Sequence, residues 1–318
     1  MAVALMMGAA VSGNTARAQF MPALPANQLL VPDKTFSIPF HWMGDSSNTT
    51  REPHMAILVP VKLANCPKLF FMQFDLGSPH SLFYKNKLAA IQQKYPAVVS
   101  LNDSTGKLVN FTFTTGKTPI TAKEIVVKQF DNSSINWGDR NSIEIIGTIG
   151  TDLIDGKVLI IDYPKKKLTI SPAIPAKLIS RMSLSDFVYA RRSILLPAKV
   201  QGKQTMLFFD TGSSMYELLT DKKTAQSLAI PNSPLLQRKV KSWDTFLTAN
   251  SLASNDSITI SSQKIPLHYA TYMEGVSNSQ VEQMMKMGIG GMTGNKLFLN
   301  HTLVLDTKNK KFGLVRKG

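Results

Sequence analysis

A pattern that occurs twice constrains the fold of this chain more than any other feature of its sequence. The apolar segment Ile57–Lys62 (ILVPVK) recurs as Ile194–Lys199 (ILLPAK), and each copy is followed by a polar turn. A second apolar run then ends in an aspartate that opens a Gly-Ser turn, in Asp75–Ser78 (DLGS) and in Asp210–Ser213 (DTGS). Internal repetition of this kind indicates a chain built from two copies of one structural unit.

The second half of each unit repeats as well. The intervals Gly150–Asp162 and Gly294–Asp306 have equal length, and each runs from a glycine turn through an apolar segment to an aspartate. A lysine-rich turn and a final apolar run follow in both copies. Elsewhere, short β-branched or aromatic runs are separated by Pro, Gly, Asn and Ser, which is typical of strands and tight turns. The sequence therefore predicts an all-β protein with two homologous lobes.

The first residues have the pattern of an export signal. Residues 2–12 form a short apolar run, and Ala16 and Ala18 fit the small-residue pattern that signal peptidase accepts. The run is shorter than the roughly 20 apolar residues that a membrane-spanning helix needs; an ordinary buried or membrane-anchoring helix is the alternative. We expect an exported protein, periplasmic or extracellular. The expected divisions are a signal peptide at 1–18, an N-terminal extension at 19–50, an N-terminal lobe at 51–172, a linker at 173–187 and a C-terminal lobe at 188–318.

The two repeated aspartates, Asp75 and Asp210, are suited to acid–base catalysis. Each follows an apolar strand and lies two residues before a glycine, which allows the backbone to approach closely. If the two turns meet, carboxyl groups about 3 Å apart cannot both ionise, and the pair titrates as a unit that holds one proton. A water between them could lose a proton to one carboxylate while the other protonates a carbonyl oxygen. Each Asp-x-Gly alone is an ordinary turn; the repeat favours a paired site that hydrolyses peptide bonds without an acyl-enzyme.

Both turns resemble the signature of the aspartic proteases. Asp210-Thr211-Gly212-Ser213 matches the Asp-Thr-Gly motif of that family, and Asp75-Leu76-Gly77-Ser78 is similar to it. The closing segments Ile149–Ile154 (IGTDLI) and Asp162–Ile170 resemble the glycine turn, short helix and last strand of the same family. Over residues 51–318 the chain is similar to bacterial two-lobed aspartic proteases of the retropepsin-like and pepsin-like type.

The resemblance implies two acid-protease-type β lobes related by a pseudo-two-fold axis, with an active cleft between them and a β-hairpin flap over the substrate. Asp75 and Asp210 would be the catalytic dyad, and Ser78 and Ser213 would hydrogen-bond its outer carboxylate oxygens. The supporting residues would be Gly77, Ser78, Thr211, Gly212 and Ser213. The substrate would be a polypeptide, and no metal or organic cofactor would take part.

Leu76 departs from the family pattern, which has Thr or Ser after each catalytic aspartate. Thr211 keeps the hydroxyl that bonds across to the other lobe, whereas the leucine side chain cannot. Loss of one arm of a buried hydrogen-bonded pair costs about 1–3 kcal/mol, and catalysis tolerates little misplacement of its groups. Two functions therefore stay open: an aspartic-type endopeptidase, and a catalytically inactive protease-fold protein that binds peptides or an envelope component.

The positive charge of the chain leaves its partners open. Lys and Arg number 36 against 21 Asp and Glu, a formal net charge of +15. The lysine runs 165–167 and 308–311 lie at matching hairpin turns of the repeat, where a solvated face is the simpler explanation; aromatic residues are not interleaved with them as in single-strand binders. We expect a monomer without a nucleic acid partner, and an anionic envelope surface is a second candidate partner. A basic adaptor for anionic polymers, whose binding salt would weaken, is the remaining alternative.

Metal and cofactor sites find little support in the sequence. The single cysteine, Cys66, excludes an intrachain disulfide and a cysteine-rich zinc site, and the five histidines show no metal-ligand spacing. The glycines between positions 288 and 294 lack the strand–loop–helix context of a dinucleotide site. His80, which follows Asp75 closely, is either a modulator of the aspartate pair or a structural residue.

Overall fold

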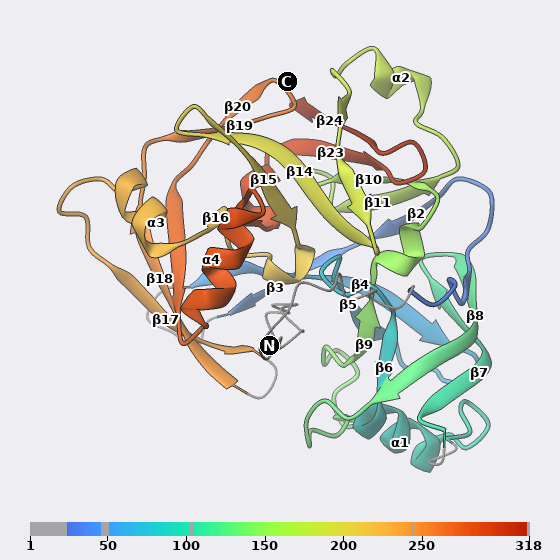
Figure 1. The fold of residues 1–318 in the computed structure, drawn as a ribbon. Helices are drawn as coiled ribbons and strands as arrows, with labels where there is room; N and C mark the ends of the chain where they lie inside the picture. The colour runs from blue at the N-terminus through green and yellow to red at the C-terminus, as the bar shows by residue number, and fades with distance from the viewer. Residues whose placement is uncertain (1–23, 46–50, 102–104, 243–244, 317–318) are drawn as a thin grey trace, which may run out of the picture.

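The computed structural model describes residues 24–45, 51–101, 105–242 and 245–316 of the chain. Two β-rich lobes lie on either side of a sheet to which both contribute strands (Figure 1). The prediction of an all-β, two-lobed protein is therefore confirmed. Among the described residues, no helix is both long enough and apolar enough to cross a membrane.

The N-terminal lobe is built on an eight-stranded sheet. Its strands are β1 (Leu29–Leu30), β3 (His41–Asp45), β4 (Glu52–Leu63), β5 (Phe70–Phe74), β6 (Leu82–Tyr84), β7 (Lys107–Thr115), β8 (Thr118–Lys128) and β9 (Ile145–Ile149). Their order is β1-β8-β6-β9-β5-β4-β3, and β7 pairs with both β4 and β8. Because β5 lies between parallel β9 and antiparallel β4, the residue that follows β5 emerges from the interior of the sheet.

The C-terminal lobe is built on a ten-stranded sheet. Its strands are β13 (Val188–Ala190), β14 (Ser193–Val200), β15 (Lys203–Phe209), β16 (Leu218–Leu219), β17 (Leu236–Ser242), β18 (Thr245–Ala253), β19 (Ser257–Ile260), β20 (Gln263–Pro266), β21 (Tyr269–Glu274) and β22 (Ile289–Thr293). Their order is β17-β18-β21-β16-β22-β15-β14-β19-β20, with β13 paired to β14. The parallel pairs β5–β9 and β15–β22 share a register shift at the same place, after Phe71 and after Met206. The two lobes therefore repeat even in this local irregularity.

A six-stranded sheet joins the lobes. Its strands are β2 (Phe36–Pro39), β10 (Val158–Asp162), β11 (Lys167–Ser171), β12 (Ser185–Asp186), β23 (His301–Asp306) and β24 (Lys311–Arg316), in the order β12-β24-β23-β10-β11-β2. At its centre the antiparallel strands β10 and β23 place Ile160 opposite Val304. These two residues occupy the same position in the repeat, so the pseudo-two-fold axis passes through this pair.

Part of the expected N-terminal extension belongs to the sheets. β1 pairs with β8, β2 pairs with β11, and β3 pairs with β4. In β2 the side chains of Phe36 and Ile38 are buried while those of Ser37 and Pro39 are exposed, which is the alternation of a strand with one face on the core. The expected signal peptide lies outside the described residues.

Short helices connect some of the strands. They are α1 (Lys85–Lys94), α2 (Ala176–Ile179), α3 (Lys222–Leu228) and α4 (Asn278–Lys286), with the 3₁₀ turns η1 (Thr151–Ile154), η2 (Thr211–Ser213) and η3 (Asn295–Phe298). The turns η1 and η3 follow the two glycines of the repeat, Gly150 and Gly294, and η2 follows Asp210.

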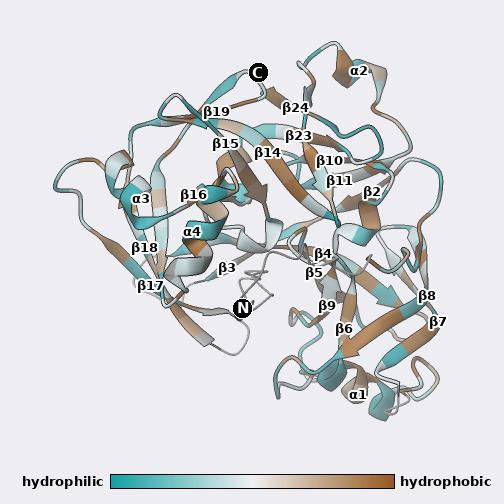
Figure 2. Ribbon diagram, in the orientation of Figure 1, coloured by the Kyte–Doolittle hydropathy of each residue, from teal (hydrophilic) through white to brown (hydrophobic). Residues whose placement is uncertain are grey.

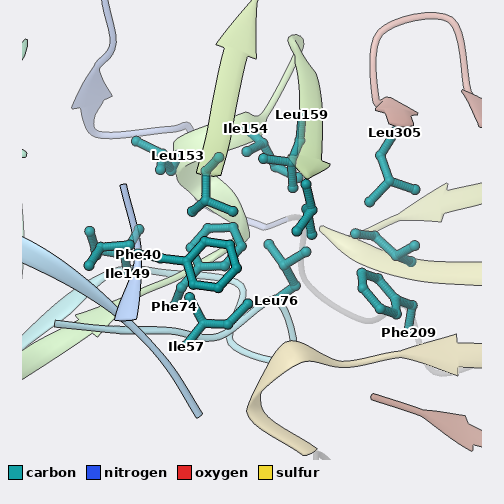
Figure 3. Packing of buried hydrophobic residues seen from close by; sticks show 14 of the residues in the cluster. Phe40, Ile57, Phe74, Leu76, Ile149, Leu153, Ile154, Leu159, Phe209 and Leu305 are labelled. Carbon is teal, nitrogen blue, oxygen red and sulfur yellow. The ribbon is translucent and has the colours of Figure 1, made fainter. Parts of the chain in front are cut away.

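One continuous apolar core runs through both lobes and the shared sheet. In Figure 2 brown apolar stretches follow the strands of both lobes and of the shared sheet, whereas much of the helices is teal. Figure 3 shows Phe74 and Leu76 of the N-terminal lobe in the same cluster as Phe209 and Leu305 of the C-terminal half. The strand ends that carry the two repeated aspartates are therefore fixed by one shared core.

Candidate active site

Asp75 and Asp210 occupy equivalent places, each directly after a central strand of its lobe. Asp75 follows β5, and its backbone N–H donates to the Ile149 carbonyl at 2.9 Å. Asp210 follows β15, and its backbone N–H donates to the Thr293 carbonyl at 3.0 Å. In both lobes the parallel neighbouring strand therefore fixes the backbone of the aspartate.

The two carboxyl groups meet at the boundary between the lobes, where they hydrogen-bond to each other. A Cβ placed on Gly77 would lie 2.5 Å from Oδ1 of Asp210, and one placed on Gly212 would lie 2.5 Å from Oδ1 of Asp75. Each glycine thus leaves the space that the carboxyl group of the other lobe fills. This close approach is the reason for glycine at both positions.

The hydrogen bonds around the two carboxyl groups differ. Oδ1 of Asp75 accepts from the Gly77 N–H at 2.9 Å, and the same oxygen of Asp210 accepts from the Gly212 N–H at 2.7 Å. The hydroxyl of Ser213 donates to Oδ2 of Asp210 at 2.9 Å, as expected from the family resemblance.

The equivalent expectation for Ser78 is wrong. Its hydroxyl donates to the carbonyl oxygen of His80 at 2.8 Å and not to Asp75. The reason is local, because Ser side chains readily bond a backbone group two residues away in a turn. Ser78 therefore hydrogen-bonds Asp75 through its backbone N–H and not through its side chain.

This difference favours Asp75 as the place of the shared proton. Burial, the charge of Asp210 and the hydrogen bond between the carboxyl groups raise the pKa of Asp75 well above its usual value. Burial also raises the pKa of Asp210, but hydrogen bonds from Ser213, Gly212 and Asp75 oppose that rise. The two buried groups titrate as a pair, and the additional hydrogen bond from Ser213 favours the proton on Asp75 and the charge on Asp210.

Thr211 and Leu76 make an unsymmetrical contact across the lobe boundary. The Thr211 hydroxyl accepts from the Leu76 N–H at 2.8 Å and donates to the Phe74 carbonyl at 2.9 Å. The Leu76 side chain is fully buried in the apolar core, beside Phe74 (Figure 3). One half of the contact is thus a pair of hydrogen bonds and the other half is apolar packing.

Two further residues, which the sequence did not single out, hold the backbone of Leu76 and Thr211. The Thr151 hydroxyl donates to the Leu76 carbonyl at 2.8 Å, and the Asn295 side-chain amide donates to the Thr211 carbonyl at 3.1 Å. Tyr163 holds Asn295 in place through a hydrogen bond of 2.8 Å. The available signal was positional, since Thr151 and Asn295 directly follow the two glycines of the repeat.

Asp152 anchors the far end of the loop that begins at Asp75. Its carboxylate accepts from the backbone N–H of Ser81 at 2.7 Å and from the Ser81 hydroxyl at 2.6 Å. Burial raises the pKa of Asp152 to about 6, although the hydrogen bonds from Ser81 and the charge of Arg192 lower it. The loop from Asp75 to Ser81 is therefore held at both ends by the N-terminal lobe.

A long hairpin of the C-terminal lobe, β17–β18, packs beside the Asp210 loop. Val240 and Leu247 of this hairpin belong to one apolar cluster with Tyr216 and Met292. At its edge Nη1 of Arg238 donates to Oδ2 of Asp45 in β3, at 2.6 Å, and so links the hairpin to the N-terminal lobe. The described residues between α1 and β7 in the N-terminal lobe form no strand, so no such hairpin is seen there.

Within the part of the chain that the structure describes, no group of three His, Cys, Asp or Glu side chains is placed to hold a metal ion. The carboxyl groups of Asp75 and Asp210 are the acid–base groups that the lobe boundary brings together. The arrangement can hold one proton and release it to a bound group.

No known protein family model matches the chain, and no curated protein matches its sequence. Among solved structures it is similar to the aspartic proteinase from Irpex lacteus, with a TM-score of 0.50 and 14% identity. The match covers 89% of this chain and 98% of that one. A likeness at this level of identity shows the fold alone, which is a pepsin-like arrangement of two β lobes. The narrower retropepsin-like and bacterial assignments stay predictions.

Proposed function

We propose that this chain is an aspartic endopeptidase that hydrolyses peptide bonds with a water held between Asp75 and Asp210. One observation carries the proposal: two aspartates from separate lobes share a hydrogen bond, and each packs against the glycine of the other lobe's loop. Two turns with a purely structural role would not be expected to bury two carboxyl groups against each other, because burial and like-charge repulsion both make this arrangement unfavourable. The pepsin-like fold supports a polypeptide as the substrate.

In the proposed reaction each carboxyl group acts once as an acid and once as a base. The Asp210 carboxylate accepts a proton from the water, whose oxygen attacks the peptide carbonyl, while protonated Asp75 donates to the carbonyl oxygen. The tetrahedral intermediate then collapses: Asp210 donates its proton to the amide nitrogen, a hydroxyl of the intermediate returns a proton to Asp75, and the C–N bond breaks to release an amine and a carboxylic acid. At the end Asp75 has regained a proton and Asp210 is ionised, so the pair returns to its starting state.

The substrate would lie along the boundary between the lobes, with the β17–β18 hairpin as its flap. Support for this assignment is the contact of the hairpin with Tyr216 beside Asp210 and its link to Asp45 of the other lobe. The chain would act after export, in the periplasm or outside the cell, because residues 1–18 have the pattern of a signal peptide.

Leu76 favours one alternative function, a catalytically inactive protein that binds peptides or an envelope component. Its apolar side chain replaces the hydroxyl expected beside the N-terminal aspartate. The structure offers a compensation, since the Leu76 backbone is hydrogen-bonded on both sides by Thr211 and Thr151. The peptidase is therefore the function that we favour.

The decisive experiment is cleavage of a denatured protein library by the wild type and by the Asp75→Asn and Asp210→Asn variants, from about pH 3 to about pH 8. We expect cleavage by the wild type only. Cleavage that persists in either variant would remove the dyad from the mechanism. A wild type that cleaves nothing at any pH but binds peptides would support the alternative.

A further inference from the structure

The turn between β13 and β14 has an unusual backbone. It consists of Arg191 and Arg192, since Ala190 and Ser193 on either side form the last pair of the hairpin. Both arginines have positive φ, 52° and 60°. Two-residue turns of this kind strongly prefer Asn-Gly, because the left-handed region is unfavourable for longer side chains. Such strain persists where surrounding contacts hold it, and it often marks a functional contact.

The side chain of Arg192 crosses the lobe boundary. It belongs to the C-terminal lobe and is buried, with 6% of its surface exposed. Nε donates to Oδ2 of Asp155 at 3.0 Å, and Nη1 lies 2.9 Å from Nδ1 of His80. Longer contacts of 3.4 Å reach the carbonyls of Pro79 and Pro25. All four partners lie outside the C-terminal lobe, either in the N-terminal lobe or in the segment before it.

Asp155 is held from the same hairpin a second time. The Tyr189 hydroxyl of β13 donates to Oδ1 of Asp155 at 3.1 Å, while Arg192 takes Oδ2. The Asp155 carboxylate that holds the guanidinium is therefore itself held by a second hydrogen bond. Nη1 contacts the loop that carries Asp75, and Nη2 contacts the segment before the N-terminal lobe.

Pro79 and His80 lie on that loop, between Asp75 and Ser81. The His80 carbonyl accepts from the Ser78 hydroxyl, and the Ser78 carbonyl accepts from the Thr151 N–H at 2.8 Å. The Asp75 carboxyl group lacks the hydroxyl donor that Ser213 gives to Asp210. The position of Asp75 therefore depends more on what holds its loop than the position of Asp210 does.

We propose that Arg192 is a positioning residue for Asp75, which holds the Asp75–Ser81 loop from across the lobe boundary with the neutral imidazole of His80 as its acceptor. The catalytic meaning of this contact rests on the proposed peptidase function. The contact itself is a property of the fold.

The contact depends on the protonation of His80. Nδ1 can accept from a guanidinium only while the imidazole is neutral, because a protonated ring donates from both nitrogens. Burial and the charge of Arg192 lower the pKa of His80, and the charge of Asp155 opposes them. Arg192 and Asp155 are the charged groups that face the ring. In strong acid the protonated ring would repel Arg192, and the loop would lose this support.

A matched control exists elsewhere in the C-terminal lobe. Lys296 of η3 donates to Oε2 of Glu52 in β4 at 2.7 Å, another ion pair between the lobes. Its ammonium group contacts Glu52 and the ring of Tyr269, which both lie outside the loop that carries Asp210. Lys296→Gln therefore removes an interlobe cation, as Arg192→Gln does, without releasing a catalytic loop.

The test compares Arg192→Gln, Arg192→Lys, His80→Gln and Lys296→Gln by kcat and KM against pH, with the Asp75 carboxyl titration followed by NMR. We expect Arg192→Gln to lower kcat about tenfold to a hundredfold with KM nearly unchanged, because small misplacement of a reacting group costs that much. Arg192→Lys should restore part of the rate. His80→Gln keeps an acceptor that cannot be protonated, so the activity should extend further into acid.

Two outcomes would overturn the proposal: an Asp75 titration that Arg192→Gln leaves unchanged, or one that Lys296→Gln shifts equally. If Arg192→Gln does not fold, the proposal would be overturned by a His80→Gln variant whose activity falls at the same acidic pH as that of the wild type. If the wild type cleaves nothing, the peptidase proposal fails, while the NMR titration still decides whether Arg192 positions Asp75.

Discussion

Gly212 lies directly against the carboxyl group of Asp75 in the other lobe, so that a Cβ at this position would be 2.5 Å from Oδ1. Gly77 has the same relationship to Asp210. Each catalytic loop of the proposed peptidase therefore depends on the absence of a side chain in the other.

Gly77→Ala and Gly212→Ala should each lose activity by about a hundredfold or more, because the added methyl group displaces the facing carboxyl group. Overpacking should also lower the free energy of unfolding by about 1–3 kcal/mol. Activity assays with thermal unfolding measure both effects. Gly138→Ala is the control, since its nearest neighbour would be Oδ1 of Asn136 at an ordinary 3.5 Å. Full activity in Gly212→Ala would contradict the close approach of the two loops.

The raised pKa of Asp75 predicts that the protein becomes less stable as the pH rises. The folded state holds a proton on this group that the unfolded chain releases near its ordinary pKa of about 3.9. The stabilisation is thus complete below about pH 4 and is lost as the pH rises through the folded pKa of Asp75. Asp75→Asn, which keeps a neutral side chain, should be more stable than the wild type at about pH 7 and gain less near pH 4. Denaturant unfolding at several pH values measures this difference; equal pH dependence in both proteins would speak against a buried shared proton.

The Thr211 hydroxyl should matter more than its methyl group. Thr211→Val leaves the Leu76 N–H and the Phe74 carbonyl without their partner in a buried place. We expect a loss of about 1–3 kcal/mol in the free energy of unfolding and a fall in kcat of about tenfold or more. Thr211→Ser keeps the hydroxyl and should remain close to the wild type. Equal damage in both variants would assign the effect to packing instead.

The link between Arg238 and Asp45 should act on substrate binding. This ion pair joins the proposed flap to β3 and is largely buried, with 11% and 20% of the side chains exposed. Arg238→Gln should raise KM several-fold and change kcat less, because the hairpin would be held less firmly over the substrate. Steady-state kinetics at low and high salt measure both.

The control for that variant is Lys107→Gln in the β7–β8 hairpin. Its partner Glu124 lies at 2.7 Å, with the two side chains 46% and 47% exposed. Such an exposed pair contributes about 0–1 kcal/mol, and kinetics should not change. A fall in kcat with an unchanged KM in Arg238→Gln would argue that the hairpin does not hold the substrate.

The parts of the fold that the repeat determines could be predicted from the sequence. Ile160 faces Val304 at the centre of the shared sheet because the two residues are counterparts in the repeat. The meeting of Asp75 and Asp210 follows from the same symmetry, since equal turns at equal strand ends must approach a common axis.

Features that break the symmetry could not be predicted. The Ser78 hydroxyl turns to His80 for a local reason that does not apply to Ser213. The long hairpin occurs between α3 and β19 in a part of the repeat whose sequences have diverged. The Arg192 contact joins residues more than a hundred positions apart through a strained turn, and the order of residues alone carries no sign of it.

Three ion pairs between the lobes, in the part of the chain that the structure describes, have the same polarity. In each pair the acid comes from the N-terminal lobe and the base from the C-terminal lobe: Glu52 meets Lys296, Asp155 meets Arg192, and Asp45 meets Arg238. Asp152 occupies the place in the N-terminal repeat that Lys296 has in the C-terminal one. If two N-terminal lobes associated, Glu52 would therefore lie near Asp152 instead of Lys296. If two C-terminal lobes associated, Arg192 would lose the carboxylate of Asp155. Although the two lobes share one architecture, their charges are complementary to each other and would not be complementary in a pair of identical lobes.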